Sequence, residues 1–215
     1  MRARYRFVFF DVDSTLVTIE GIDVLAGGNP EIARLTDAAM NGQIPLDEVY
    51  GRRLEAIRPT RRAVEELGRR YVDSLVAGAA ETIDALRNAG SDIHLVTAGI
   101  AQAIEPLAEH LRIPHRAVHA VALKFDAAGG YEDFDRRSFL TRTGGKELVV
   151  RDVRARSKGN AVLIGDGVSD LEARPAVDLF IGFGGVHTRP RVRDNADVFI
   201  ATPRLDAVLL HLIEP

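Results

Sequence analysis

The sequence contains no cysteine and no tryptophan, and it has only two methionines. Without cysteine, disulfides, a thiol nucleophile and zinc sites built on thiolates are excluded, and a reducing compartment is favoured. A basic excess is also missing: the formal net charge is −3 and the pI is about 6.1, which argues against nucleic-acid binding. The apolar run before Asp11, Phe7–Phe10, is too short for a signal peptide or a membrane span. We therefore expect a cytoplasmic protein, monomeric or homodimeric, with no membrane or nucleic-acid partner.

Short apolar runs recur along the chain, and each is followed by small or acidic residues. Segments with helical spacing of apolar residues alternate with them. Such runs are typical of strands buried on both faces in a parallel sheet. The alternation predicts an α/β fold with a doubly wound, mostly parallel sheet and helices on both faces. The expected strands are Phe7–Phe10, Ile93–Val96, Ala161–Ile164, Leu179–Ile181 and Val198–Ile200.

Residues 17–75 interrupt this alternation, because they show only helical periodicity. Leu46, Val49 and Leu54 share one helical face, and prolines stand near the expected helix starts. We predict an all-helical cap inserted into a catalytic core of residues 1–16 and 76–215. Residues 117–135, with glycines at 129 and 130, predict a small β-hairpin within the core.

The strongest chemical signal is the pair Asp11 and Asp13, directly after the first expected strand. Ligands of doubly wound sheets bind beyond the carboxyl ends of the strands. Two carboxylates there repel each other unless a cation lies between them, and Mg²⁺ binds carboxylates together with phosphate oxygens. On its own, such a pair is equally typical of an exposed acidic turn.

A second acidic pair follows another expected strand. Asp166 stands between Gly165 and Gly167, and Asp170 comes one helical turn later. Four carboxylates beyond the ends of two strands are hard to explain as solvated surface. Together they predict a metal site made by Asp11, Asp13, Asp166 and Asp170.

Two further segments suit a phosphate group. Thr97 brings a hydroxyl to the expected end of the second strand, followed by Ala98 and Gly99 at the start of a helix. Lys146 follows two glycines and begins another helix. Lysine is scarce, because only Lys124, Lys146 and Lys158 among the 28 basic residues are lysine. This scarcity favours a specific role for Lys146, with Lys158 as the rival position.

These segments, in this order, resemble the four motifs of the haloacid dehalogenase superfamily. The likeness is closest to the phosphoserine phosphatases, and it covers nearly the whole chain. It extends to the stretches around Glu20, around Met40 and Arg53, and from Ile164 to Gly185. The resemblance implies Mg²⁺-dependent hydrolysis of O-phospho-L-serine, which is the last step of serine biosynthesis.

The resemblance also implies roles for individual residues. Asp11 would be the nucleophile and Asp13 the acid and base, while Asp11, Asp166 and the Asp13 carbonyl would hold Mg²⁺ with Asp170 behind them. Glu20 would bind the substrate's ammonium group and Arg53 its carboxylate. The catalytic set is thus Asp11, Asp13, Thr97 and Lys146, and the substrate-binding set is Glu20, Met40, Arg53, Thr97, Ala98, Lys146 and Ser169.

Patterns within the chain leave two of these roles open. Arg53 falls inside the apolar stripe of its helix, where a cation needs a partner or ligand unless it extends past the edge of the stripe. Glu20 is equally suited to the acidic start of a helix. His115 and His119 are four residues apart, but no third ligand accompanies them, so we expect no zinc site there.

Four positions depart from the phosphoserine phosphatase pattern. Thr97 stands where serine is usual but keeps a hydroxyl, Ala98 stands where glycine is usual, Asn41 also replaces a glycine, and Leu46 replaces a phenylalanine. The alternatives are therefore a related phosphatase for another small phosphomonoester, or a phosphotransferase. A phospho-accepting signalling domain lacks an acid/base carboxylate two residues after its aspartate, so Asp13 argues against it. A non-catalytic binding protein is disfavoured because all the chemical groups are present.

Overall fold

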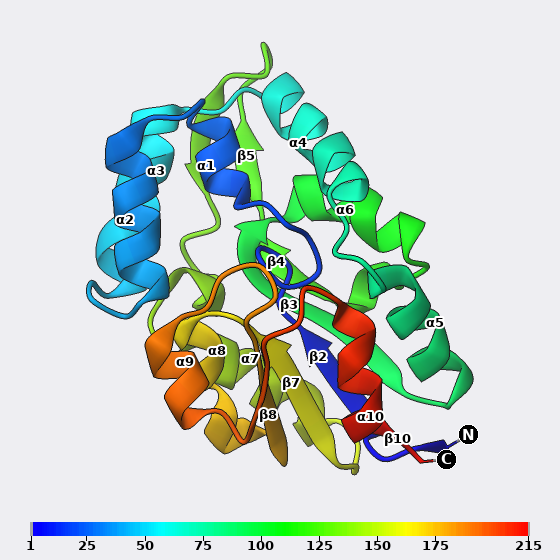
Figure 1. The fold of residues 1–215 in the computed structure, drawn as a ribbon. Helices are drawn as coiled ribbons and strands as arrows, with labels where there is room; N and C mark the ends of the chain where they lie inside the picture. Colours follow the sequence, from blue (N-terminus) through cyan, green and yellow to red (C-terminus); the bar gives the residue numbers. More distant parts are fainter. Residues whose placement is uncertain (1, 215) are drawn as a thin grey trace.

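The computed structural model describes residues 2–214 and is organised around a six-stranded sheet (Figure 1). All neighbouring strands in the sheet are parallel, which confirms the predicted doubly wound α/β fold. The strand order is β4 (Val118–Val121), β3 (Asp92–Ile100), β2 (Phe7–Phe10), β7 (Ala161–Gly165), β8 (Leu179–Phe183) and β9 (Val198–Ile200).

The central strand β2 is buried on both faces, and each of its residues is 4% exposed or less. Helices α7 (Gly145–Ala155), α8 (Val168–Glu172) and α9 (Pro190–Asn195) cover one side of the sheet. Helices α5 (Ala79–Asn88), α6 (Ala101–His110) and α10 (Leu209–Leu212) lie on the other side (Figure 1). Two very short strands, β1 (Arg2–Ala3) and β10 (Ile213–Glu214), pair antiparallel and bring residues 2–3 and 213–214 together. Within residues 2–214, no helix is both long enough and apolar enough to cross a bilayer.

The helical insertion, residues 17–75, forms four helices beside the carboxyl ends of the strands: α1 (Gly21–Leu25), α2 (Pro30–Met40), α3 (Leu46–Ile57) and α4 (Arg61–Asp73) (Figure 1). Local capping explains their starts. Asn29 accepts a hydrogen bond from the Glu31 N–H, and Thr60 accepts one from the Ala63 N–H. At the base of the insertion, Val17 pairs with Leu75, and the Val76 N–H donates to the Leu16 carbonyl at 2.9 Å.

Two expectations about local structure need correction. The hairpin was expected over 117–135, but residues 118–121 form the edge strand β4 of the main sheet. The hairpin itself consists of β5 (Leu123–Phe125) and β6 (Tyr131–Phe134). Residues 118–121 pair with β3, whereas residues 123–125 pair with β6. No turn residue between Val121 and Leu123 marks this division in the sequence, because it depends on the edge of β3 that is available for pairing. Strand β3 also continues to Ile100, with irregular register after Val96, because Ile100 pairs with Val121.

A pair of histidines packs on the sheet near its edge. His94 of β3 and His119 of β4 approach to 3.2 Å between Nδ1 and Nε2, and their rings stack at a centroid distance of 5.5 Å. In this contact one nitrogen must donate and the other accept, so the accepting ring is neutral. Burial, and then the neighbouring His94, lowers the pKa of His119 from 6.5 to about 4. His115 lies apart from this pair and contacts Glu105 instead.

This pair predicts a stability that depends on pH. Between about pH 6.5 and about pH 4 the unfolded chain binds a proton at His119 that the folded chain does not bind. The free energy of unfolding therefore has its full value above about pH 6.5 and falls as the pH drops toward about 4. We expect a loss of roughly 1 kcal/mol, reduced from the full shift because both rings are partly solvent-exposed.

Urea unfolding at several pH values measures this effect. His119→Asn, which cannot titrate, should lose less stability on acidification than the wild type. The control His110→Asn changes an exposed histidine and should keep the wild-type pH dependence. Equal acid sensitivity of all three proteins would contradict the assignment.

Candidate active site

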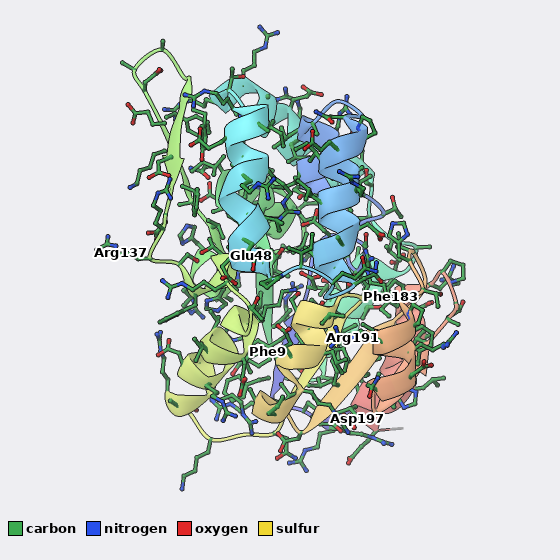
Figure 2. All side chains as sticks on the ribbon, turned by 90° about the vertical axis from the view of Figure 1, so that its left-hand side faces the viewer. Phe9, Glu48, Arg137, Phe183, Arg191 and Asp197 are labelled. Atoms are coloured by element: carbon green, nitrogen blue, oxygen red, sulfur yellow. The ribbon has the colours of Figure 1, made fainter. Side chains whose placement is uncertain are left out.

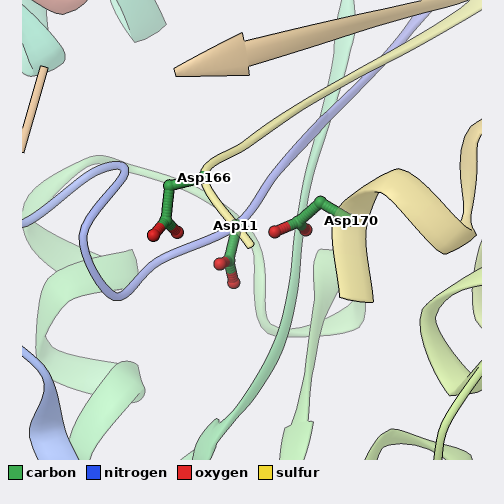
Figure 3. Close-up of side chains that lie close together, drawn as sticks. All are labelled: Asp11, Asp166 and Asp170. Atoms are coloured by element: carbon green, nitrogen blue, oxygen red, sulfur yellow. The ribbon is translucent and has the colours of Figure 1, made fainter. Parts of the chain in front are cut away.

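Three buried carboxylates converge beyond the ends of β2 and β7 (Figure 3). Asp11 directly follows β2, Asp166 directly follows β7, and Asp170 lies on α8. One oxygen from each lies within 4.8 Å of the others, and their residues are 2%, 0% and 0% exposed. The structure therefore brings together three of the four predicted metal-site aspartates through their side chains, and Asp13 is not part of this cluster.

Two glycines let Asp166 and Asp170 share the site. A Cβ at Gly165 would overlap the Asp170 carboxylate, so only glycine fits there. The Gly167 N–H donates to Asp170 Oδ2 at 3.1 Å, which fixes the carboxylate at the start of α8. The glycines on either side of Asp166 thus let the Asp166 and Asp170 carboxylates pack closely together at the end of β7.

Two cations contact these three aspartates. Lys146 lies in the first turn of α7, and its Nζ is 2.8 Å from Asp11 Oδ1 and 2.7 Å from Asp170 Oδ1. Arg189, just before α9, donates from Nε to Asp166 Oδ2 at 3.0 Å. Lys158 is exposed at the opposite end of the sheet, before β7, so Lys146 is the lysine of this site.

The pKa values reflect this crowding of buried charge. Burial, followed by repulsion from Asp11, raises the pKa of Asp166 from 3.8 to about 7, although Arg189 opposes the shift. Burial and Asp11 also raise the pKa of Asp170 well above its usual range. Burial disfavours the charged form of Lys146, but Asp11 and Asp170 outweigh this effect and raise its pKa. The aspartate cluster therefore favours the binding of additional positive charge.

Asp13 faces the same region through a sharp turn of the chain. Ser14 makes this turn with a φ of 54°, an uncommon conformation for a residue with a side chain. Asp13 Oδ1 accepts hydrogen bonds from the Gly21 N–H and from the Tyr71 hydroxyl, both at 2.7 Å. Burial raises the pKa of Asp13 to about 6, with Tyr71 opposing and Asp11 adding to the shift. Near neutral pH this carboxyl can both lose and regain a proton, as an acid/base group must.

A cavity adjoins these carboxylates and extends between the core and the helical insertion. Thr97 lies within β3, not at its end as expected, and its Oγ1 accepts from the Gly99 N–H at 2.9 Å. Together with all the other predicted substrate-binding residues, Thr97 borders the cavity. The predicted residues on its lining are Asp11, Asp13, Glu20, Met40, Arg53, Thr97, Ala98, Lys146 and Ser169.

Glu20 and Arg53 lie on the insertion side of this cavity. Glu20 directly precedes α1 at the N-cap position but makes no side-chain capping bond, and its carboxylate instead accepts from the Ser14 hydroxyl at 2.6 Å. Arg53 is 5% exposed, so it does not extend past the edge of its stripe into solvent. Its Nη1 donates to Thr36 Oγ1 at 3.1 Å, and its Nε has no partner among the described residues. An unpaired buried guanidinium N–H beside a cavity is available to an anionic ligand.

The positions that depart from the family pattern separate in space. Thr97, Ala98 and Leu46 line the cavity, whereas the Asn41 side chain points back along α2 and donates to Asp37 Oδ1 at 2.9 Å. Thr97, Ala98 and Leu46 can therefore contact a ligand in the cavity directly.

Sequence reasoning missed Arg189, which is only 6% exposed. Besides Asp166, it contacts Asp37 of α2 at 3.1 Å and Glu20 at 3.8 Å. Arg191 on α9, seen below the insertion helices in Figure 2, also donates to the Gly42 carbonyl at 3.2 Å. These contacts tie the insertion to the core. The only available signal was an arginine in the loop after an expected strand, and arginine is too abundant in this chain for that to stand out.

Comparison with known proteins agrees with this geometry. The family model for haloacid dehalogenase-like hydrolases matches residues 8–173. The chain is 36% identical over 200 residues to phosphoserine phosphatase of Drosophila melanogaster, covering 91% of this chain and 74% of that protein. It is also 36% identical over 197 residues to human phosphoserine phosphatase, covering 90% of this chain and 88% of the human protein.

A solved structure shares the fold. It is described as a phospho-aspartyl intermediate analogue of phosphoserine phosphatase, and it superimposes with a TM-score of 0.84 at 24% identity. The match covers 98% of this chain and 100% of that chain. The family match and the sequence relatives establish the family: the chain belongs to the haloacid dehalogenase-like hydrolases.

Proposed function

We propose that this protein is a Mg²⁺-dependent phosphoserine phosphatase, which hydrolyses O-phospho-L-serine to L-serine and phosphate through an aspartyl-phosphate at Asp11. The observation that carries the proposal is the composition of one cavity. Carboxylates, a lysine and a threonine hydroxyl that suit phosphoryl transfer line its core side, and the Glu20 carboxylate and the buried Arg53 guanidinium line its insertion side. The relatives named phosphoserine phosphatase support the same substrate.

The residues present fit a magnesium ion. Asp11, Asp166 and Asp170 offer oxygen ligands close together, and Mg²⁺ prefers oxygen. The formal charges agree as well, because two cations, Lys146 and Arg189, contact the three aspartates, so a net negative charge remains. We propose Asp11, Asp166 and the Asp13 carbonyl as ligands, with Asp170 supporting them. When bound, Mg²⁺ would neutralise this charge and stabilise the negative oxygens of the transferring phosphoryl group.

The proposed chemistry has two steps. In the first, an Asp11 carboxylate oxygen bonds to phosphorus as the bond from phosphorus to the seryl oxygen breaks. The seryl oxygen keeps the electron pair and takes a proton from Asp13. In the second, Asp13 accepts a proton from water as the water oxygen attacks phosphorus, and the Asp11 carboxylate is released. Lys146 and Thr97 would stabilise the charge on the transferring oxygens.

Glu20 and Arg53 would recognise the amino acid. Burial and the nearby Asp13 raise the pKa of Glu20 well above its usual range, so a substrate ammonium would find a partner that gains from added positive charge. Arg53, with its unpaired Nε, would bind the substrate carboxylate. We further propose that the helical insertion acts as a cap that excludes water, and that the protein works in the cytoplasm as the last enzyme of serine biosynthesis.

A matched set of phosphomonoesters tests the substrate. We expect the highest kcat/KM for L-phosphoserine. Ethanolamine phosphate lacks only the carboxylate, and 3-phosphooxypropanoate lacks only the amine, so each should lose roughly ten- to a hundredfold. Phosphate release should stop with EDTA and return with Mg²⁺. Chelator-sensitive activity that favours another ester would keep the phosphatase assignment and reject phosphoserine. Transfer of phosphate to added serine in preference to water would instead indicate a phosphotransferase.

Arg53→Ala tests the carboxylate contact. Because one charge-assisted contact is removed, kcat/KM for phosphoserine should fall roughly ten- to a hundredfold, while kcat/KM for ethanolamine phosphate stays nearly unchanged. Arg52→Ala is the matched control, since the neighbouring Arg52 is exposed on the same helix. Equal losses of Arg53→Ala on both substrates would argue against a carboxylate contact.

Asp11→Asn tests the nucleophile. The amide keeps the size of the side chain but cannot form the phosphoenzyme, so we expect kcat to fall at least about a thousandfold. Circular dichroism checks that the variant is folded, and Asp73→Asn, at an exposed aspartate, serves as a control that should remain active. Near-normal turnover by Asp11→Asn would reject the nucleophile.

A further inference from the structure

The carboxylate of Asp13 is held asymmetrically. Its Oδ1 accepts two short hydrogen bonds, from the Gly21 N–H and the Tyr71 hydroxyl. Its Oδ2 accepts no hydrogen bond from residues 2–214. Instead it lies on the side of Gly99, where a Cβ would come within 3.1 Å of Oδ2 and 3.2 Å of Thr97 Oγ1. Oδ2 of Asp13 therefore faces the part of the cavity lined by Thr97 and Gly99.

Tyr71 is a dedicated donor in this arrangement. It comes from α4 of the helical insertion and is 1% exposed. Burial, with Asp13 beside it, raises the pKa of Tyr71 well above 10, so the hydroxyl stays protonated. A carboxylate accepts such a bond readily, and a hydrogen bond to a charged acceptor is among the stronger ones in proteins.

The chain also makes room for this hydroxyl. A Cβ at Gly21 would overlap the Tyr71 hydroxyl, so glycine at this position permits the contact. Gly21 supplies the second donor to the same oxygen through its backbone N–H. One residue without a side chain and one tyrosine therefore fix Asp13 Oδ1 together. In the sequence, Tyr71 only continues the helical spacing of Val64 and Leu67, which is typical of a core residue.

We propose that Tyr71 is a positioning residue for the acid/base carboxyl. By occupying Oδ1 together with Gly21, it leaves Oδ2 as the oxygen that carries the proton to the leaving group. The proposal rests on the proposed function, because it assumes that Asp13 protonates an alcohol. It also makes the alignment of the acid depend on the docking of α4, so the helical insertion contributes to the chemistry as well as to substrate recognition.

The leaving group separates this role from a structural one. A seryl oxygen leaves poorly unless it receives a proton as the bond to phosphorus breaks, whereas p-nitrophenolate departs without one. The ratio kcat/KM covers the steps up to release of the alcohol, so the later attack of water does not enter it. A misaligned acid must therefore lower kcat/KM for phosphoserine but not for p-nitrophenyl phosphate.

The test compares Tyr71→Phe with Tyr131→Phe in the full-length protein. Tyr131 is also buried, and its hydroxyl has no hydrogen-bond partner among the described residues, so the control makes the same chemical change away from Asp13. For Tyr71→Phe we expect kcat/KM for phosphoserine to fall about tenfold and that for p-nitrophenyl phosphate to change less than about twofold. For Tyr131→Phe we expect both values to stay within about twofold.

A second variant guards against misfolding. Gly21→Ala displaces the Tyr71 hydroxyl without removing it, and it should show the same selective loss on phosphoserine. Equal losses on both substrates, or no loss on phosphoserine in folded Tyr71→Phe, would overturn the proposal. If the wild type cleaves p-nitrophenyl phosphate but not phosphoserine, the proposed phosphoserine specificity is wrong, but the role of Tyr71 is not yet tested. Glycerol phosphate, or another alkyl ester that the wild type does cleave, then tests Tyr71 by the same comparison. Failure to cleave any alkyl phosphate would overturn both.

Discussion

Mutual repulsion among buried carboxylates is the constraint on which the rest of this structure depends. Asp11, Asp166 and Asp170 meet at one edge of a parallel sheet because their strands run in the same direction and end together. Such a cluster is costly without positive charge, since burial disfavours every ionised form. Lys146 and Arg189 supply part of that charge from separate elements. The negative charge that these two cations leave uncompensated favours the binding of a metal ion, which in turn can bind a phosphate group.

The helical insertion supplies what the sheet edge lacks. Helix α3 contributes Arg53, α4 contributes Tyr71, and α2 contributes Thr36, which receives a hydrogen bond from Arg53. These contacts reach the site only while the insertion lies against the core. Arg189 joins the two parts, because the same guanidinium contacts Asp166 in the core and Asp37 on α2. A loss of docking would therefore affect the aspartate cluster and the substrate side of the cavity at the same time.

The sequence predicted the parallel sheet, the helical insertion and the residues around the cavity, because an apolar run marks the strands beside the site and each pair of aspartates follows such a run. It did not predict Arg189 or Tyr71. Arg189 is one arginine among many, and Tyr71 is indistinguishable from a core residue in its helical stripe, so their roles follow only from tertiary contacts. The same holds for β4, whose partner is the edge of β3 and not the next strand along the chain. Local patterns specify elements, whereas long-range pairing decides which side chains meet.

The most direct test of the account is to look for the covalent intermediate itself. The protein would be mixed with phosphoserine and Mg²⁺, quenched in acid, digested with pepsin and mapped by mass spectrometry. The account predicts one phosphate on the peptide that contains Asp11, removed by hydroxylamine as expected for an acyl phosphate and absent in Asp11→Asn. Phosphate on a peptide containing Thr97 in place of Asp11 would contradict it.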